Sequence, residues 1–142
     1  MLSPSLVVTS DNSEYLDVIK ELLMGAGYLR VRCCIQRLAV FDLVQREQPD
    51  LVLLDVSMGH PGAGWRILDL LRLHPATTHI PILLCLTDPR MVSAKEAMLA
   101  DMRCAMLEKP FDLDTLLSKI RTLVGSHLRQ TTMSPERSAY LW

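Results

Sequence analysis

Residues 49–56, Pro-Asp-Leu-Val-Leu-Leu-Asp-Val, constrain the fold of this chain more than any other stretch. The apolar run at 51–54 predicts a short strand buried on both faces, which is typical of the centre of a parallel sheet. Burying a lone carboxylate costs on the order of several kcal/mol, so we expect Asp55 at the C-terminal end of this strand. In open α/β sheets that end is where ligands and chemistry collect. Asp55 is therefore a candidate functional residue, and the alternative is that it only caps the next turn.

Strands and helices alternate along the chain. Four other short apolar segments predict strands, at residues 5–9, 28–35, 82–87 and 103–107. Apolar residues at helical spacing predict a helix after each strand, at about residues 11–24, 36–48, 65–73, 89–100 and 112–124. This alternation predicts an α/β fold, a doubly wound five-stranded parallel sheet with helices on both faces.

The order of the strands follows from which of them look exposed. The second strand alternates apolar residues with Arg30 and Arg32, which indicates an edge strand with one wet face. The fifth strand is less apolar and is placed at the other edge. With right-handed crossovers, these two edges predict the order 2-1-3-4-5.

The chain length suits one domain, and local signals mark the ends of its first and last helices. Asp11 and Glu14 resemble a capping box at the start of the first helix, and Gly125 is expected to end the last one. The 142 residues suit a single domain, which we place at 1–125. For residues 126–142 three alternatives remain: a disordered tail, an extension of the last helix, or the start of a linker.

Charge and composition indicate which classes of partner to expect and in which cellular compartment the protein lies. The formal net charge is −1, which gives no reason to expect nucleic-acid binding by this domain. No apolar run reaches the ~20 residues of a membrane span, and no signal peptide is visible, so we expect a cytoplasmic protein without a membrane segment. The four cysteines contain no C-x-x-C pair, and we expect them to be buried free thiols: Cys33, Cys34, Cys85 and Cys104.

Polar side chains follow several of the predicted strands. Asp11, Asp55 and Thr87 come at the ends of the first, third and fourth strands, and Lys109 follows the fifth. The carboxyl ends of parallel strands share one edge of the sheet, so these four residues should converge on one crevice. Two carboxylates suit Mg²⁺, which prefers oxygen ligands, and an Asp beside this ion can attack a phosphoryl group. The Thr87 hydroxyl and the Lys109 ammonium would then bond the acyl phosphate.

Over about residues 5–125 the chain resembles the receiver domains of two-component response regulators, the CheY-like family. Five stretches carry the resemblance: residues 6–8 before the acidic turn, Ala26-Gly27-Tyr28, the Asp55 strand at residues 49–55, His79-Ile80-Pro81-Ile82 and Lys109-Pro110-Phe111-Asp112. It implies a flavodoxin-like fold and phosphorylation of Asp55 by a histidine kinase or a phosphotransfer protein. It also implies Mg²⁺ held by the acids after the first strand, by Asp55 and by the backbone carbonyl of Ser57.

The resemblance also implies a switch. The Thr87 hydroxyl would move toward the phosphate and Lys109 would pair with it. The face formed by the fourth helix, the fifth strand and the fifth helix would then change, and two copies could dimerise through it. The signal would pass to a downstream effector protein or to an output domain that these 142 residues do not contain.

Four positions depart from the family pattern. Ser10 stands where the first of two adjacent acids is usual, so one Mg²⁺ ligand is weak or lost. The loop after Asp55 is longer and contains His60. Thr87 comes one residue later after Pro81 than usual, so either the fourth strand has an extra residue or the switch hydroxyl is absent. Met106 replaces the aromatic residue expected three residues before Lys109.

Two functions remain open, and neither is an enzyme. The first is a receiver that is phosphorylated on Asp55 in a phosphorelay. The second is a degenerate receiver that works as a phosphorylation-independent interaction or dimerisation module. Enzymes on this architecture fit less well, because Ser57 stands where a haloacid-dehalogenase-type phosphatase needs a second Asp, and the turn at 10–12 has no glycine for a dinucleotide.

Overall fold

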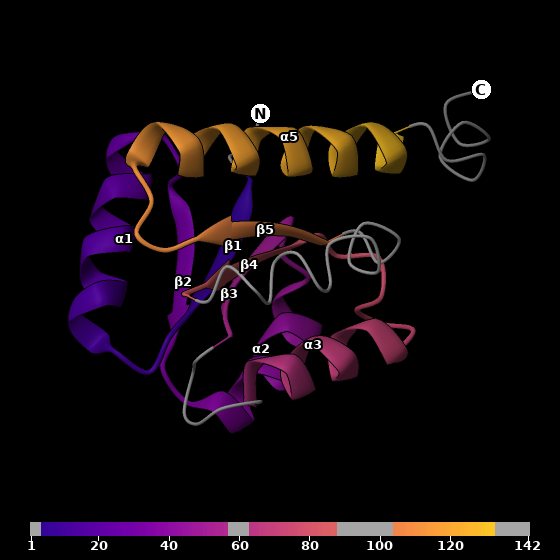
Figure 1. Cartoon of the computed structure of the whole chain (residues 1–142). Helices are drawn as coiled ribbons and strands as arrows, with labels where there is room; N and C mark the ends of the chain where they lie inside the picture. Colours follow the sequence, from indigo (N-terminus) through magenta and orange to yellow (C-terminus); the bar gives the residue numbers. More distant parts are fainter. Residues whose placement is uncertain (1–3, 57–62, 88–103, 133–142) are drawn as a thin grey trace.

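The computed structural model describes residues 4–56, 63–87 and 104–132, which form a parallel sheet between two layers of helices (Figure 1). The strands, in chain order, are β1 (Ser5–Thr9), β2 (Arg30–Cys34), β3 (Leu51–Asp55), β4 (Ile82–Leu86) and β5 (Cys104–Glu108). They pair in the order β2-β1-β3-β4-β5 and every pair is parallel. The predicted fold class and strand order are confirmed.

Among the described residues, two helices cover each face of the sheet. The helices are α1 (Ser13–Gly25), α2 (Val40–Glu47) with a 3-10 turn before it (Arg37–Ala39), α3 (Ala63–Leu73) and α5 (Leu113–Thr132). The apolar residues of α1 and α5 pack on one face, and those of α2 and α3 on the other (Figure 1). The helix predicted at about residues 89–100 lies outside the described residues. Among those that are described, no helix is both long and apolar enough to cross a bilayer.

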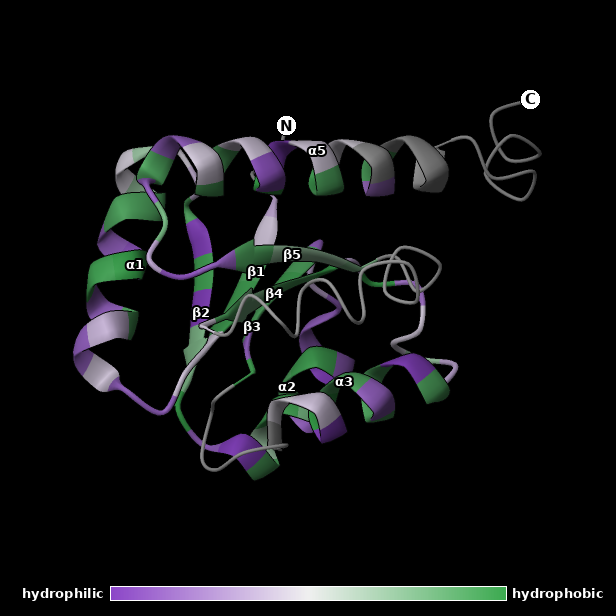
Figure 2. Ribbon diagram, viewed as in Figure 1, coloured by the Kyte–Doolittle hydropathy of each residue, from purple (hydrophilic) through white to green (hydrophobic). Residues whose placement is uncertain are grey.

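The central strands divide the core into two layers. All five residues of each of β1, β3 and β4 are buried, as expected for strands covered on both sides. Leu51 and Leu53 join the layer under α1 and α5, whereas Val52 and Leu54 join the layer under α2 and α3. Figure 2 shows the contrast with β2, whose ribbon carries hydrophilic segments where the central strands are hydrophobic.

The edge strand β2 differs from the expected pattern at its end. Cys34 is buried in the layer that contains Val40, although it continues the alternation that puts Arg30 and Arg32 on the wet face. Cys33 is exposed, although all four cysteines were expected to be buried. A strand at the edge has a neighbour on one side only, so α1 covers its outer residues incompletely. The other three cysteines are buried and all four are free thiols.

Two helix ends also differ from expectation. Asn12, not Asp11, caps α1, because its side-chain oxygen accepts a hydrogen bond of 3.1 Å from the backbone N–H of Tyr15. Gly125 does not end α5, which continues to Thr132. A glycine inside a helix costs only about 1 kcal/mol relative to alanine. The extension carries His127, whose Nε2 lies 3.6 Å from Asp50 Oδ1, and this contact ties it to the sheet.

Candidate functional site

Asp55 ends β3 and is nearly buried. Its residue exposure is 4%, and its Cα partner in β4 is Cys85. One carboxylate oxygen, Oδ2, accepts a hydrogen bond of 3.2 Å from the Ser10 hydroxyl and one of 2.9 Å from the Lys109 ammonium. The Asp55 backbone N–H donates to the Thr9 hydroxyl at 3.4 Å. A carboxylate this deeply buried is stabilised by a charged partner and by hydrogen bonds.

Lys109 supplies the positive charge of the site. It follows β5 directly, and its backbone N–H donates to the Leu86 carbonyl at the end of β4. The ion pair with Asp55 joins side chains that are 21% and 5% exposed. The pairing of the β3 and β5 chain ends with β4 therefore brings together two residues that the sequence separates by fifty-four positions.

Ser10 is buried inside the site, and the next residue, Asp11, is exposed. Ser10 is 1% exposed, and its hydroxyl accepts from the Asn12 backbone N–H at 3.2 Å while donating to Asp55. Asp11 is exposed to solvent. At the first of the two positions where an acid was expected, the chain thus has a hydroxyl that hydrogen-bonds Asp55, and only the second position carries charge.

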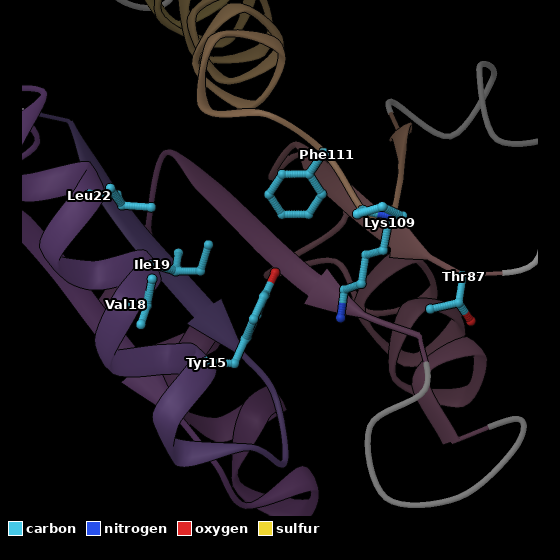
Figure 3. Close-up of a pocket in the computed structure, with 8 residues that line it drawn as sticks. Tyr15, Val18, Ile19, Leu22, Thr87, Lys109 and Phe111 are labelled. Atoms are coloured by element: carbon cyan, nitrogen blue, oxygen red, sulfur yellow. The ribbon is translucent and has the colours of Figure 1, made fainter.

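Thr87 follows β4 and is exposed. β4 pairs with β3 from Ile82 to Cys85 and with β5 from Ile82 to Leu86, and neither ladder contains a bulge. The last strand position is therefore Leu86, which is 3% exposed and belongs to the apolar core. In Figure 3 the Thr87 hydroxyl points away from the Lys109 ammonium. Thr87 lines the same pocket as Lys109 and Tyr15, and its role as the switch hydroxyl stays a prediction.

Tyr15 is a site residue that sequence analysis missed. It lies in the first turn of α1, and the Lys109 Nζ atom sits 4.5 Å from the centre of its ring. Figure 3 shows the side chain reaching from α1 toward Lys109, in the pocket that also contains Phe111. The available signal was an aromatic residue three positions after Asn12, one turn into a helix that starts at the functional edge.

The Tyr15 hydroxyl and the Cys85 thiol lie close to each other and to the Asp55 carboxylate. Both groups are neutral at physiological pH. Burial raises the pKa of Tyr15 well above its ordinary value, and the nearby Cys85 and Asp55 add to this. Burial also raises the pKa of Cys85 to about 12, which Lys109 partly offsets. The Tyr15 hydroxyl is fully buried, and it has no well-formed hydrogen bond to any residue that the structure describes.

Replacing Tyr15 with phenylalanine should raise the free energy of unfolding by about 1 kcal/mol, because a buried polar atom without a hydrogen bond is destabilising. The ring would keep its packing. Urea unfolding of wild-type and Tyr15→Phe proteins measures the difference. A loss of stability in the variant would mean that the hydroxyl has a partner of real strength, with the Cys85 thiol as the nearest candidate.

A pocket of about 470 Å³ opens beside the ion pair (Figure 3). One wall is the α1 surface at Val18, Ile19 and Leu22, and the other is the turn after β5 at Pro110 and Phe111. These walls are apolar, and the Lys109 side chain beside them is 21% exposed. Contacts of the ammonium with a carboxylate and a ring are stronger in such surroundings than in bulk water.

The oxygen donors of the site are of the type that suits Mg²⁺, which keeps several waters and needs only one or two carboxylates. Asp55 and Asp11 provide carboxylates, and Ser10 provides a hydroxyl. Ser57, whose carbonyl was expected as a further ligand, lies outside the described residues, as does His60. Within residues 4–56, 63–87 and 104–132 no cluster of three or more His, Cys, Asp or Glu side chains could hold a metal ion. The donors present suit Mg²⁺, with a Ser10 hydroxyl where a second acid was expected.

Residues 6–121 match the response regulator receiver domain as a family. The chain belongs to the response regulator receiver family. The match covers most of the domain expected at 1–125, and it assigns these residues to the receiver of a two-component system.

Curated relatives include receivers of two kinds. The chain is 27% identical over 137 residues to the DNA-binding dual master transcriptional regulator RpaA of a Synechocystis strain, covering 96% of this chain and 54% of RpaA. It is 23% identical over 124 residues to the polar-differentiation response regulator DivK of Brucella abortus, covering 87% of this chain and 98% of DivK. The chain thus spans about half the length of RpaA and nearly all of DivK.

Solved structures show the same fold. The chemotaxis response regulator CheY4 of Vibrio cholerae superposes with a TM-score of 0.72 at 21% identity, over 86% of this chain and 99% of that one. NtrX of Brucella abortus superposes with a TM-score of 0.77 at 20% identity, over 96% of this chain and 30% of NtrX. At these identities the likeness concerns the flavodoxin-like fold alone.

Proposed function

We propose that this receiver accepts a phosphoryl group on Asp55 from a histidine kinase or a phosphotransfer protein and passes the signal on through a conformational change. The observation that carries the proposal is the contact of 2.9 Å between the Lys109 ammonium and the nearly buried Asp55 carboxylate. An aspartate that will carry a phosphoryl group benefits from a cation at hydrogen-bond distance.

In the proposed reaction an Asp55 oxygen attacks phosphorus, a new P–O bond forms and the P–N bond of the phosphohistidine breaks. The electron pair of that bond returns to the imidazole of the donor. Mg²⁺, when held by Asp55 and Asp11, would neutralise charge on the phosphoryl oxygens. Lys109 would shift from the carboxylate to a phosphoryl oxygen, and Ser10 would hold the remaining carboxylate oxygen in place. The chain is a phosphoacceptor in this scheme and not an enzyme.

The test is the mass of the intact protein after incubation with acetyl phosphate and Mg²⁺. We expect the wild-type protein to gain the mass of one phosphoryl group, and the Asp55→Asn protein to gain none, because the nucleophilic oxygen is gone. Removing Mg²⁺ with a chelator should abolish the gain. Absence of any gain in the wild type, under conditions that modify an ordinary receiver, would refute the proposal.

The second candidate is a degenerate receiver that binds partners without being phosphorylated. Two observations favour it. Leu86, an apolar residue, occupies the end of β4 where a hydroxyl was sought, and Ser10 replaces one of the acids. Such a protein would fold and bind in the same way with Asp55→Asn, so partner binding that is unaffected by this substitution would support it.

The proposed partners follow from the family and from the relatives. RpaA is described as DNA-binding and is about twice as long as this chain. We therefore propose that the signal passes to an output domain outside these 142 residues or to a separate effector, with no contact to nucleic acid or membrane by the receiver itself. A homodimer through the helix predicted at about residues 89–100, β5 and α5 is part of the same proposal. The four free thiols support a cytoplasmic location.

A further inference from the structure

In the part of the chain that the structure describes, two groups contact the Lys109 ammonium, and Asp55 is one of them. The second is the face of the Tyr15 ring, whose centre lies 4.5 Å from the nitrogen atom. The two contacts come from different elements, since Asp55 ends β3 and Tyr15 belongs to α1. Lys109 itself follows β5. The ammonium is therefore fixed between the sheet edge and the first helix.

The ring contact limits where the lysine can go. A lysine side chain has a flexible stem with several rotatable bonds, and a single charged partner does not restrict it to one path. An ammonium that rests on an aromatic face gains electrostatic attraction from the ring, and the attraction grows when water is excluded. Here the lysine side chain is only 21% exposed, and the walls around it are apolar.

We propose that Tyr15 is the positioning residue for Lys109: its ring holds the ammonium over Asp55 and keeps it over the phosphoryl group when Asp55 is modified. The second half of this statement rests on the proposed function, whereas the first half does not. Tyr15 acts through Lys109 and does not itself touch the reacting atoms. The position of this residue in α1 also links the charge state of the site to the first helix.

The ring, and not the hydroxyl, performs this role. The hydroxyl points into the protein beside Cys85 and has no well-formed hydrogen bond among the described residues. It therefore neither anchors the lysine nor donates to Asp55. A phenylalanine at position 15 would keep the aromatic face, and a leucine would keep most of the apolar volume without the face. These two substitutions separate positioning from simple filling of space.

The first experiment observes Lys109 directly in the unphosphorylated protein by NMR. The ring current of Tyr15 should shift the side-chain signals of Lys109 away from those of the other lysines. We expect this shift to remain in Tyr15→Phe and to disappear in Tyr15→Leu. The matched control is Tyr28→Leu, because Tyr28 packs in the same apolar layer but lies near Arg121. That variant should leave the Lys109 signals where they are.

The second experiment measures the rate of phosphorylation by acetyl phosphate and Mg²⁺. Tyr15→Leu should slow it about three- to tenfold, which corresponds to one cation–π contact, while Tyr15→Phe and Tyr28→Leu should react like the wild type. An unchanged rate in Tyr15→Leu, or an equal loss in Tyr15→Phe, would overturn the positioning role.

The two experiments separate the proposals. If the wild-type protein takes no phosphoryl group, the proposed function fails, while the Lys109 signals still decide whether the ring holds the lysine. If those signals are the same in the phenylalanine and leucine variants, the positioning role fails whatever the phosphorylation result. Thermal unfolding of each variant confirms that the comparison is made between folded proteins.

Discussion

Replacing Lys109 with methionine should lower the free energy of unfolding at neutral pH by about 3 kcal/mol, the typical cost of removing one partner of a buried ion pair. Methionine has a similar length and keeps the apolar contact of the stem with the turn after β5. What it lacks is the charge, and Asp55, with a side chain that is 5% exposed, would then retain the Ser10 hydroxyl but not its ammonium partner. Urea unfolding monitored by circular dichroism measures the loss.

The control is the double variant Asp55→Asn/Lys109→Met, in which no charge remains at this position. Most of the lost stability should return, because replacing both members of a buried pair by neutral groups is close to neutral in free energy. If the double variant is as unstable as Lys109→Met, then the loss comes from packing and not from the uncompensated carboxylate. The same lysine substitution should also slow phosphorylation of Asp55, since the charge next to the phosphoryl oxygens would be missing.

The second large effect is expected at Gly64, the second residue of α3. A Cβ atom built there would lie 2.5 Å from the carbonyl oxygen of Val56 and equally close to other backbone atoms of that residue. The Gly64 N–H donates a hydrogen bond of 3.2 Å to the same carbonyl, so the two backbones are tied together and neither can simply move apart. Gly64→Ala should therefore lower the free energy of unfolding by about 3 kcal/mol, the upper range for overpacking.

Gly25→Ala is the matched control for this substitution. Gly25 is the last residue of α1, and a Cβ atom there would meet nothing within 4 Å. The substitution should be neutral or stabilise by about 0.5 kcal/mol through the lower entropy of the unfolded chain. Both proteins can be compared by urea unfolding. Equal effects at the two glycines would show that the close approach of Gly64 to Val56 relaxes without cost.

Strand order was predictable because it depends on features that act locally or obey general rules. Four consecutive apolar residues before Asp55 identify a strand covered on both faces, and the arginines of β2 identify an edge. The handedness of crossovers then leaves the order found here. The same reasoning placed Asp55 and Lys109 at one edge of the sheet, where the structure brings them within 2.9 Å of each other.

Local signals were less informative where neighbouring elements compete with them. Glycine commonly ends helices, but α5 continues past Gly125 to Thr132. The contact of His127 with Asp50 lies in this extension. The alternation in β2 did not predict that Cys34 is buried and Cys33 exposed, because coverage of an edge strand depends on where the adjacent helices lie. The exposure of these two cysteines depends on how the layers pack, so the five residues of the strand alone do not predict it.

The sequence by itself determined the class of the fold, the order of the strands and the edge at which the polar residues gather. Periodicity, turn residues and chain handedness are sufficient for those features, because each acts within one element or between consecutive ones. The tertiary structure alone decided that Leu86 ends β4, that Ser10 bonds Asp55 and that the Tyr15 ring lies under Lys109. Those facts depend on strand register and on the depth at which α1 packs, and both are set by contacts between residues far apart in the chain.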